Sequence, residues 1–506
     1  MRLVASAAVA ACLPALALAE GDLPRFQPVE VASHVYTGGW EHFVGGGVAV
    51  FDCNGDQLPE VYAAGGANAA QLFLNASAND VALSPNTPDE LSLTSVTGAY
   101  PLDIDSDGTM DLAVLRVGED LLLRGTGDCR FEPFTDIAFI SGDHWTTGFS
   151  ATWEDGQTLP TLAFGTYVDR SDPIGPFEAC DATQLYRPVG DGYDMPLALE
   201  PGFCALSILF SDWSRSGRAD LRISNDRHYY VRGGQEQLWA MGPAPRLYTS
   251  EDNWQAFSIW GMGIASRDLS GDGFPEVYLT SMGDQKLQQF DPETGGPTWR
   301  DVTYEFGTTA HRPHVGGDGR PSTGWHAQFG DVTNDGRDDI FVAKGNVDQM
   351  PGLAMEDPNS LLLQSPNGRF TEAADIAGVA TMDRSRGAAV VDLNMDGLLD
   401  LVVVNRRADM EVFQNVTPHP GNWLMVSLRQ TGSNSNAVGG FIELRNADGL
   451  MTREITIGGG HVSGQASPEH FGLGAAETAE LRVIWPDGTI GDWQTVSANQ
   501  VLTITR

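Results

Sequence analysis

The sequence predicts an all-β protein, a seven-bladed β-propeller followed by a small C-terminal β-sandwich. A short acidic loop between strand-like apolar runs recurs along most of the chain. Its spacing of roughly 50 to 60 residues, with several short strands per unit, is typical of a propeller. After Val416 the loop no longer occurs, and alternating runs separated by turn residues indicate a compact antiparallel sandwich.

The best-defined repeat spans Gly98–Gly118, with the nine-residue loop Asp103–Asp111 at its centre. Aspartates occupy loop positions 1, 3, 5 and 9, and Gly108 at position 6 gives the backbone the freedom to turn. Calcium prefers six or more oxygen ligands, which these carboxylates and the carbonyl at position 7 would supply. The short apolar runs on both sides predict a strand–loop–strand unit and not an EF-hand.

The same spacing recurs in four more loops, at Asp52–Glu60, Asp268–Glu276, Asp331–Asp339 and Asp392–Asp400. The predicted calcium ligands of the five loops are the side chains at positions 1, 3, 5 and 9: Asp52, Asn54, Asp56, Glu60, Asp103, Asp105, Asp107, Asp111, Asp268, Ser270, Asp272, Glu276, Asp331, Thr333, Asp335, Asp339, Asp392, Asn394, Asp396 and Asp400. We expect about five calcium ions, each fixing one hairpin and neutralising its acids. The alternative is a set of Asx-rich turns without metal.

Two repeats depart from this pattern and complete the count of seven. The loop Asp212–Asp220 has Ser214 and Ser216 where the others have acids, so calcium binding there stays open. The segment 148–165 keeps its flanking strands but has lost the loop, and we expect no calcium in it. Gln57 also departs from the pattern, because the other loops have glycine at position 6.

The N-terminus has the features of an export signal. Arg2 precedes the apolar stretch Leu3–Leu16, and a small-x-small cleavage site ends before Glu20. No other stretch approaches membrane-spanning length, so we expect a periplasmic or extracellular protein, with lipoprotein anchoring through Cys12 as a minor alternative.

The expected domains follow from these boundaries: a signal peptide at 1–19, the propeller at 20–416, a linker at 417–421 and the sandwich at 422–506. Propellers commonly close by pairing a terminal strand with the last blade. The segment Glu20–Val44 is the natural candidate for that strand.

Loss of Cys12 with the signal leaves four cysteines, an even number suited to an oxidising compartment. Three pairings are possible. The pairing of Cys53 with Cys129 and of Cys180 with Cys204 is favoured, because it would tie the first loop to the second unit and staple the irregular third and fourth units.

The composition excludes some functions. The chain has 67 acidic and 30 basic residues, a formal net charge of −37, which argues against a nucleic-acid partner. No nucleophile elbow, HExxH motif or phosphate-binding glycine loop occurs, and no catalytic residue is predicted.

Two other groups of residues allow a functional and a structural interpretation. His311, His314 and His326 would suit a transition metal, but His-x-x-His in a Pro/Gly-rich loop is a weak signal. Five tryptophans would suit either a carbohydrate-binding face or packing between blades: Trp145, Trp239, Trp254, Trp260 and Trp325. His461 and His470 are expected to be structural hydrogen-bonding residues.

The repeats resemble the FG-GAP (VCBS-type) units of integrin-α-like seven-bladed propellers, which carry a DxDxDGxxD loop in each blade. The last 85 residues resemble the ASPIC/UnbV domain in these stretches: Asn422–Leu424, Val438–Gly440, Thr452–Glu454, Gly458–His461, His470–Gly474, Val483–Gly488 and Asn499–Leu502. The combination resembles the cartilage acidic protein family and its bacterial secreted relatives.

The function expected from these observations is that of an exported calcium-binding module. It would bind a protein or polysaccharide ligand in an adhesion-type role. One alternative is a carbohydrate-active or other hydrolytic enzyme that uses a propeller face. Another is a scaffold for an exported complex.

Overall fold

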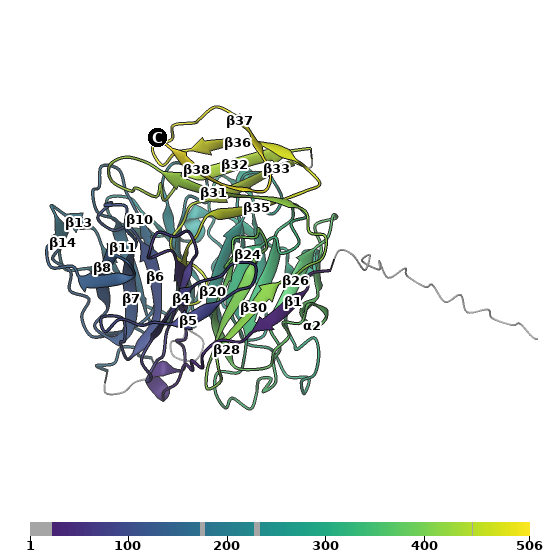
Figure 1. Cartoon of the computed structure of the whole chain (residues 1–506). Helices are drawn as coiled ribbons and strands as arrows, with labels where there is room; N and C mark the ends of the chain where they lie inside the picture. Colours follow the sequence, from purple (N-terminus) through teal and green to yellow (C-terminus); the bar gives the residue numbers. More distant parts are fainter. Residues whose placement is uncertain (1–22, 173–177, 227–232, 448) are drawn as a thin grey trace, which may run out of the picture.

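The structure is a computed structural model that describes residues 23–172, 178–226, 233–447 and 449–506. The expected signal peptide at 1–19, with Cys12, lies outside the described residues. Most of the chain forms a ring of antiparallel sheets, and the C-terminal residues form a cap on one end of the ring (Figure 1). The predicted all-β class and propeller are therefore confirmed.

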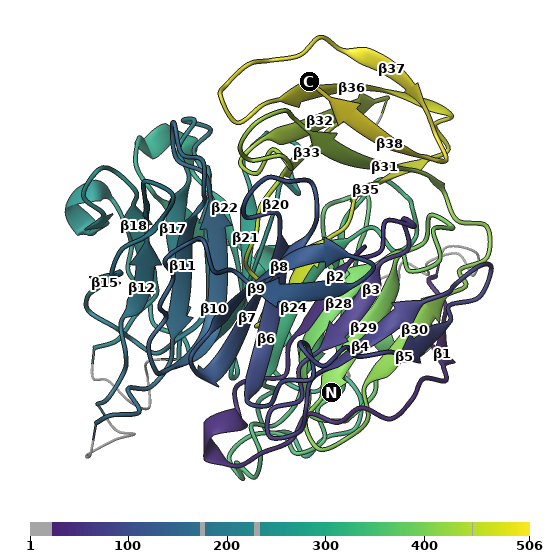
Figure 2. The ribbon, with the colours of Figure 1, turned by 60° about the vertical axis from the view of Figure 1, so that its left-hand side comes forward.

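Seven four-stranded blades make up the ring, and the innermost strands of successive blades lie side by side (Figure 2). Blade 1 consists of β2 (Val48–Phe51), β3 (Glu60–Ala63), β4 (Gln71–Asn75) and β5 (Leu83–Pro85). Blade 2 consists of β6 (Val96–Leu102), β7 (Asp111–Gly118), β8 (Leu121–Gly127) and β9 (Arg130–Pro133). Blade 3 consists of β10 (His144–Thr152), β11 (Thr161–Thr166), β12 (Thr183–Tyr186) and β15 (Leu197–Leu199). Blade 3 also carries a small hairpin of β13 (Pro188–Val189) and β14 (Gly192–Tyr193).

Blades 4 to 6 follow the same order of strands. Blade 4 consists of β16 (Ala205–Ser211), β17 (Asp220–Asn225), β18 (Gln237–Ala240) and β19 (Arg246–Leu247). Blade 5 consists of β20 (Gly261–Arg267), β21 (Glu276–Ser281), β22 (Lys286–Phe290) and β23 (Trp299–Asp301). Blade 6 consists of β24 (Gly324–Gly330), β25 (Asp339–Lys344), β26 (Ser360–Gln364) and β27 (Phe370–Glu372). The helical elements are short: η1 (Trp40–His42), η2 (Ser250–Asp252), η3 (Pro292–Thr294), α1 (Thr303–Phe306) and α2 (Ala374–Ala377).

Blade 7 joins the two ends of the ring. It contains β28 (Ser385–Val391), β29 (Asp400–Asn405) and β30 (Glu411–Asn415), and its outer strand is β1 (Phe26–Val29). Phe26 pairs with Asn415, so the segment expected to close the propeller does so. Inner strand β28 contacts β2 of blade 1, which completes the ring.

Packing between blades supplies the core. Trp213, Trp254 and Trp299 form one buried cluster with Leu238, and Trp213 and Trp299 lie 5.0 Å apart between ring centroids. Complete burial of one large apolar side chain contributes about 1.5–3 kcal/mol, so these clusters dominate blade-to-blade stability.

The disulfides Cys53–Cys129 and Cys180–Cys204 are formed, as favoured from the sequence. Within the described residues, no helix is long and apolar enough to cross a membrane.

The C-terminal domain is a sandwich of two sheets around a core that includes Leu424, Ile442 and Phe471. One sheet consists of β31 (Asn422–Arg429), β35 (Glu469–Gly474) and β38 (Gln500–Thr505), and the other of β32 (Phe441–Asn446), β33 (Gly449–Glu454), β36 (Thr478–Ile484) and β37 (Gln494–Ser497). The expectation of a purely antiparallel sandwich was wrong, because β31 and β38 pair in parallel.

The sandwich is also not a separate compact unit. Residues 455–466, which we call the axial segment, leave it between β33 and β35 and enter the propeller. Its strand β34 (Gly464–Ala466) pairs in parallel with β2 of blade 1. Bridges from Ile457, Gly458, Gly460 and Ser463 reach blades 3, 4, 5 and 2.

Glycines allow this close approach. A side chain at Gly47 would place its Cβ 1.8 Å from the Val462 carbonyl oxygen, and one at Gly458 would lie 2.7 Å from Ser150 Oγ. Gly458 also has a φ of +132°, which favours glycine. The axial segment therefore depends on backbone-to-backbone contact at the centre of the ring.

Candidate metal-binding loops and the axial segment

The five predicted loops connect the first and second strands of blades 1, 2, 5, 6 and 7, and they share one hydrogen-bonding scheme. The acid at position 1 accepts the backbone N–H of position 6 at 2.6–2.9 Å in every loop. The acid at position 9 accepts the backbone N–H of position 2 at 2.7–3.1 Å. These bonds fold each loop so that its acids lie close together.

Blade 2 has the tightest cluster. Carboxylate oxygens of Asp103, Asp105 and Asp111 lie within 4.8 Å of one another, and Asp103 and Asp111 are buried. Arg124 Nε lies 2.8 Å from Asp105 Oδ2 and compensates part of the charge. Oxygen atoms at these separations form a donor set that suits a hard cation such as calcium.

Burial makes these acids costly to ionise. It raises the pKa of Asp111 to about 8, the pKa of Glu60 and Glu276 to about 7, and the pKa of Asp392 to about 7. Neighbouring acids of the same loops raise these pKa values further, while backbone N–H groups lower them. A cation among the acids would favour their charged form.

Blade 7 provides an independent test of whether the residues fit a cation. Asn394, at position 3, is buried, and its Oδ1 accepts no hydrogen bond from the described residues. Its amide group donates to the Asn79 carbonyl oxygen at 2.8 Å and to Asp396 Oδ2 at 2.9 Å. A buried oxygen that accepts no hydrogen bond costs free energy unless a ligand binds to it, so the residues fit a cation.

In blade 4, hydrogen-bond donors of the protein surround Asp220, the acid at position 9 of the loop. Asp220 Oδ2 accepts hydrogen bonds from Trp213 Nε1 at 3.1 Å and Tyr248 Oη at 2.9 Å. Asp220 Oδ1 accepts the Met241 N–H at 2.9 Å and lies 3.2 Å from Arg218 Nε. Protein donors therefore surround this carboxylate, and Arg218 brings a positive charge to it.

In blade 3, the eroded loop between β10 and β11 is paired with a cation from elsewhere in the blade, Arg187, which follows β12. Arg187 Nε lies 2.7 Å from Glu154 Oε1, which also accepts a hydrogen bond from the Thr161 hydroxyl group. In contrast, the acids of the blade 1, 5 and 7 loops form no ion pair within the described residues.

In three loops, the residue at position 4 contacts the C-terminal domain. Ser106 Oγ accepts the Asn434 N–H at 2.9 Å in blade 2, and Arg215 Nη2 lies 2.6 Å from Glu443 Oε1 in blade 4. In blade 6, the Asn334 carbonyl oxygen accepts the Gly474 N–H at 2.8 Å. All three loop residues have φ of +57° to +60°, in the left-handed region, so they share one local backbone conformation.

Loop acids also contact the C-terminal domain directly. Ser435 donates a hydrogen bond to Asp103 Oδ2, and a Cβ at Gly472 would lie 1.8 Å from Asp331 Oδ2. The predicted metal-binding loops thus form the surface on which the C-terminal domain sits. Sequence analysis missed this, because position 4 supplies no ligand and varies between loops.

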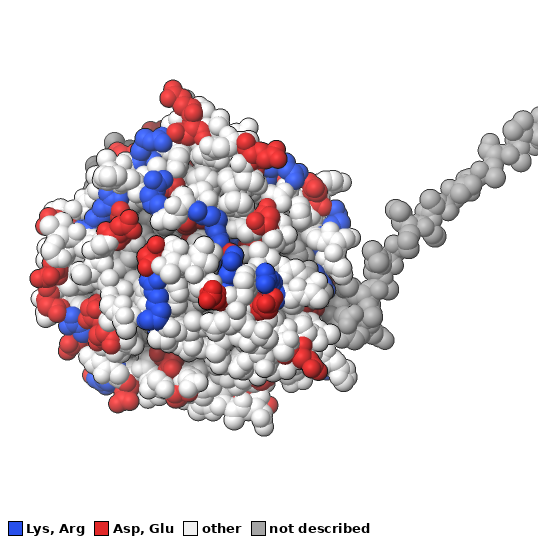
Figure 3. Space-filling model, turned by 90° about the horizontal axis from the view of Figure 1, so that it is seen from above, with Lys and Arg blue, Asp and Glu red and all other residues white. Residues whose placement is uncertain are grey.

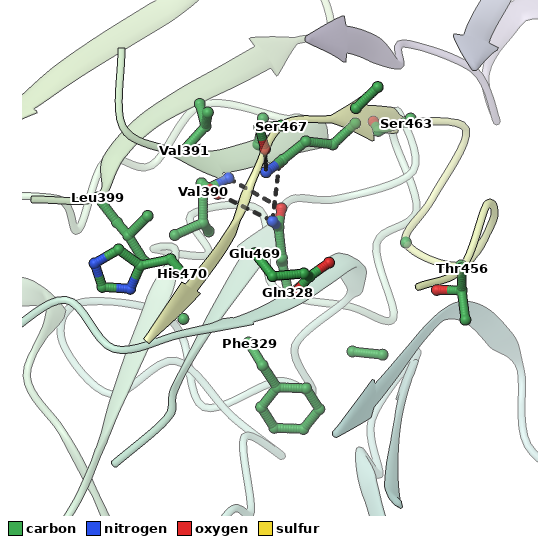
Figure 4. Close-up of a pocket in the computed structure, with 18 of the residues that line it drawn as sticks. Gln328, Phe329, Val390, Val391, Leu399, Thr456, Ser463, Ser467, Glu469 and His470 are labelled. Atoms are coloured by element: carbon green, nitrogen blue, oxygen red, sulfur yellow. Dashed lines mark hydrogen bonds between the residues drawn. The ribbon is translucent and has the colours of Figure 1, made fainter. Parts of the chain in front are cut away.

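The axial segment lines a cavity of about 210 Å³ at the same end of the ring. Figure 4 shows Gln328 joining neighbouring strands there: its amide donates to Val390 O and Gln465 Oε1, each at 3.0 Å. Glu469 lies 3.5 Å from Arg267 Nη1. Burial lowers the pKa of His470, another lining residue, to about 4, so its ring is neutral.

The histidines predicted as a candidate metal site do not come together. His311 Nδ1 lies 2.9 Å from Asp284, and His314 Nδ1 lies 3.4 Å from Glu372. His326 is buried at the ring axis, where its Nδ1 accepts the His461 N–H at 3.1 Å. Within the described residues, no metal-sized group of three ligating side chains contains a histidine.

Most of the tryptophans considered for a carbohydrate-binding face are packing residues. Trp145, Trp239, Trp254 and Trp325 are buried. Trp325 also stacks on the Arg386 guanidinium group, whose carbon lies 4.1 Å from the ring centroid.

Comparisons with known proteins agree with this architecture. The family model of FG-GAP-like repeats matches residues 52–114 and 331–403, and the model of ASPIC and UnbV matches 430–506. Cartilage acidic protein 1 of Xenopus tropicalis is 34% identical over 111 residues, which is 21% of this chain and 17% of that protein. The human protein is 32% identical over 127 residues, 24% of this chain and 19% of that one. The chain thus matches less than a fifth of the length of these relatives.

Solved structures show a more distant likeness. The BBS1N chain of a complex with ARL6DN has a TM-score of 0.44 and 10% identity, covering 78% of this chain and 97% of that one. An Agrocybe aegerita lectin that recognises non-reducing terminal N-acetylglucosamine has a TM-score of 0.39 and 15% identity, covering 74% and 94%.

Proposed function

We propose that this chain, which carries FG-GAP-like repeats and a C-terminal ASPIC and UnbV domain, is an exported, calcium-loaded module that binds a protein or polysaccharide ligand. The resemblance noted from the sequence is confirmed by the family models. Neither family is typical of enzymes. The two disulfides are consistent with export.

The proposal rests above all on the blade 2 cluster, where three carboxylates converge within 4.8 Å. In each of the five loops, the side chains at positions 1, 3, 5 and 9 would hold one calcium ion. When bound, calcium supplies positive charge. The chain itself then holds the loop closed through the shared bonds from positions 2 and 6 to the acids.

The same contacts suggest what calcium would do for the protein. Because Ser435 bonds to Asp103 and Gly472 packs on Asp331, a fixed loop is also a fixed seat for the C-terminal domain. The role proposed for the ions is therefore structural, at the joint between the two parts of the chain. Blade 4 would need no ion, since Arg218 already lies beside Asp220.

Metal content is the direct test. Protein lacking only the expected signal peptide would be equilibrated with calcium, freed of unbound metal and measured by elemental analysis. About five ions per chain, lost on chelation and regained on addition, is the expected result. Fewer than one ion per chain would refute the calcium assignment and leave the loops as Asx-rich turns.

A further inference from the structure

Blade 3 is the most irregular blade. Its first loop lacks the nine-residue acidic spacing of the other blades, and it carries the additional β13–β14 hairpin between its third and fourth strands. Its outer strand β15 ends the sheet, so one side of the β15 backbone has no strand partner among the described residues. Figure 1 places the hairpin, and Figure 2 places β15, at the outer side of the ring.

Four large apolar side chains are exposed around this strand. Met195 is 82% exposed, Ile140 71%, Val189 61% and Leu197 51%. The segments that carry them are tied together: Val189 pairs with Gly192, Leu197 pairs with Leu185, and Tyr186 Oη donates to the Ile140 carbonyl oxygen at 3.0 Å. We call these four residues the blade 3 patch.

The outer strands of the other six blades lack this feature. Their exposed residues are polar or proline: Gln27, Pro28, Ser84, Pro85, Arg130, Glu132, Pro133, Arg246, Arg300, Asp301 and Thr371. Polar residues and proline protect a sheet edge from pairing with another chain. Only β15, among the outer strands, combines an open edge with an exposed large apolar residue, Leu197.

Acidic residues border the patch. Asp191, Asp194 and Glu200 are exposed and lie within three residues of its members along the chain. The nearby Arg187 is already committed to Glu154 and to the carbonyl oxygens of Gly242 and Pro243. In comparison, acidic and basic side chains are mixed over the face of the C-terminal domain (Figure 3).

We propose that the blade 3 patch binds an extended segment of a partner protein, which pairs with β15 and presents apolar side chains together with lysine or arginine. Strand addition satisfies the open backbone edge, the apolar side chains cover the patch, and the basic groups meet its acidic border. A second copy of this chain fits poorly, because it would bring a second acidic border. The inference rests on the proposed role as an interaction module, but it does not depend on calcium.

The test is selection from a random dodecapeptide display library on the full protein, followed by affinity measurement of the enriched peptides. Peptides that alternate apolar and basic residues should be enriched. Met195→Lys and Leu197→Lys should each weaken their binding at least tenfold, because each change removes apolar contact and adds a like charge. Tyr304→Lys is the matched control: Tyr304 is 89% exposed on α1, far along the chain from the patch, and should change nothing.

Several results would overturn the proposal. These are no enrichment, enrichment of acidic peptides, equal binding by the Leu197→Lys variant, or binding of glycans alone on a glycan array. Dimerisation that Leu197→Lys abolishes would assign the patch to a second copy instead. Metal content and melting of each variant, measured in parallel, separate failure of this inference from failure of the calcium proposal.

Discussion

Blades 4 and 7 solve the same electrostatic problem in two ways. Both bury an aspartate at the end of the loop, Asp220 in one and Asp400 in the other. Asp220 is surrounded by an indole N–H, a hydroxyl group, a backbone N–H and the Arg218 guanidinium group. Asp400 receives two backbone N–H groups and lies among other acids, which raise its pKa further above its ordinary value after burial has raised it.

If the loops bind calcium as proposed, this difference explains how a repeat would lose its metal. A blade that gains an arginine beside the last acid, and an indole and a hydroxyl group around it, would need no external cation. A blade that keeps its acids without such donors would depend on one. On this proposal, one fold would combine metal-dependent and metal-independent blades, and both kinds keep the hydrogen bond from the position 6 N–H to the acid at position 1.

Among the tests of this comparison, removal of calcium should change the free energy of unfolding most. A ligand at a hundred times its Kd stabilises the folded state by about 2.7 kcal/mol per site, so loss of several ions should cost several kcal/mol. Urea unfolding of chelated and calcium-loaded protein measures the difference. Identical unfolding curves would place blade 7 with blade 4, as a blade that needs no cation.

The pH dependence of the chelated protein should be the next largest effect. The pKa of Asp111 is about 8 and that of Glu60 about 7 in the folded chain, against 3.8 and 4.5 for the free groups. The folded state therefore holds more protons, and stability should fall as pH rises from about 4 to about 8, by up to 1.4 kcal/mol per unit for each group.

Calcium should abolish most of this pH dependence, because a cation favours the ionised acids. The measurement is unfolding at several pH values with and without calcium. A chelated protein that becomes more stable towards pH 8 would contradict the assignment of these acids as uncompensated.

Single substitutions in the two blades should separate metal loss from donor loss. Asp400→Asn should remove one calcium ion per chain and reduce the stabilisation that calcium provides. Asp220→Asn should leave the calcium content unchanged and cost about 1–3 kcal/mol with or without calcium, since its protein donors lose a charged acceptor. Elemental analysis and unfolding curves provide both readouts, and loss of an ion in Asp220→Asn would show that blade 4 also binds metal.

The most local expected effect concerns the seat of the C-terminal domain. Gly472→Val should force the domain away from Asp331, at a cost of about 1–3 kcal/mol, because the added Cβ would overlap that carboxylate. Protease sensitivity of the C-terminal domain reports the displacement. Gly352→Val is the control, since a Cβ there meets no atom within 4 Å. Equal sensitivity of both variants would show that the contact is not important.

Local patterns made the propeller predictable from the sequence. The loops repeat at constant positions, and their flanking strands follow from short apolar runs, so the number of blades and the closing strand β1 could be predicted. The favoured disulfide pairing was correct for the same reason, since it joined features already placed by the repeat.

Contacts between distant parts of the chain were not predictable. Gly458–His461 has the composition of a turn between two strands of the sandwich, and nothing local indicates that it enters another domain. Likewise Ser106, Arg215 and Asn334 differ in chemistry, so their shared role at position 4 becomes visible only when the C-terminal domain lies above them.

The axial segment also bears on how the protein is made. Ser463 Oγ accepts the Val48 N–H across a separation of 415 residues, and Phe26 of the outermost strand pairs with Asn415. In a chain that emerges from its N-terminus, β2 can pair with β3 early, but its parallel partner β34 is missing until nearly all of the chain has been delivered. Its final residues then supply the ring's central contacts, so a chain truncated near residue 450 would lack the middle of the propeller as well as most of the cap. For such a chain, completion of synthesis and completion of folding are nearly the same event.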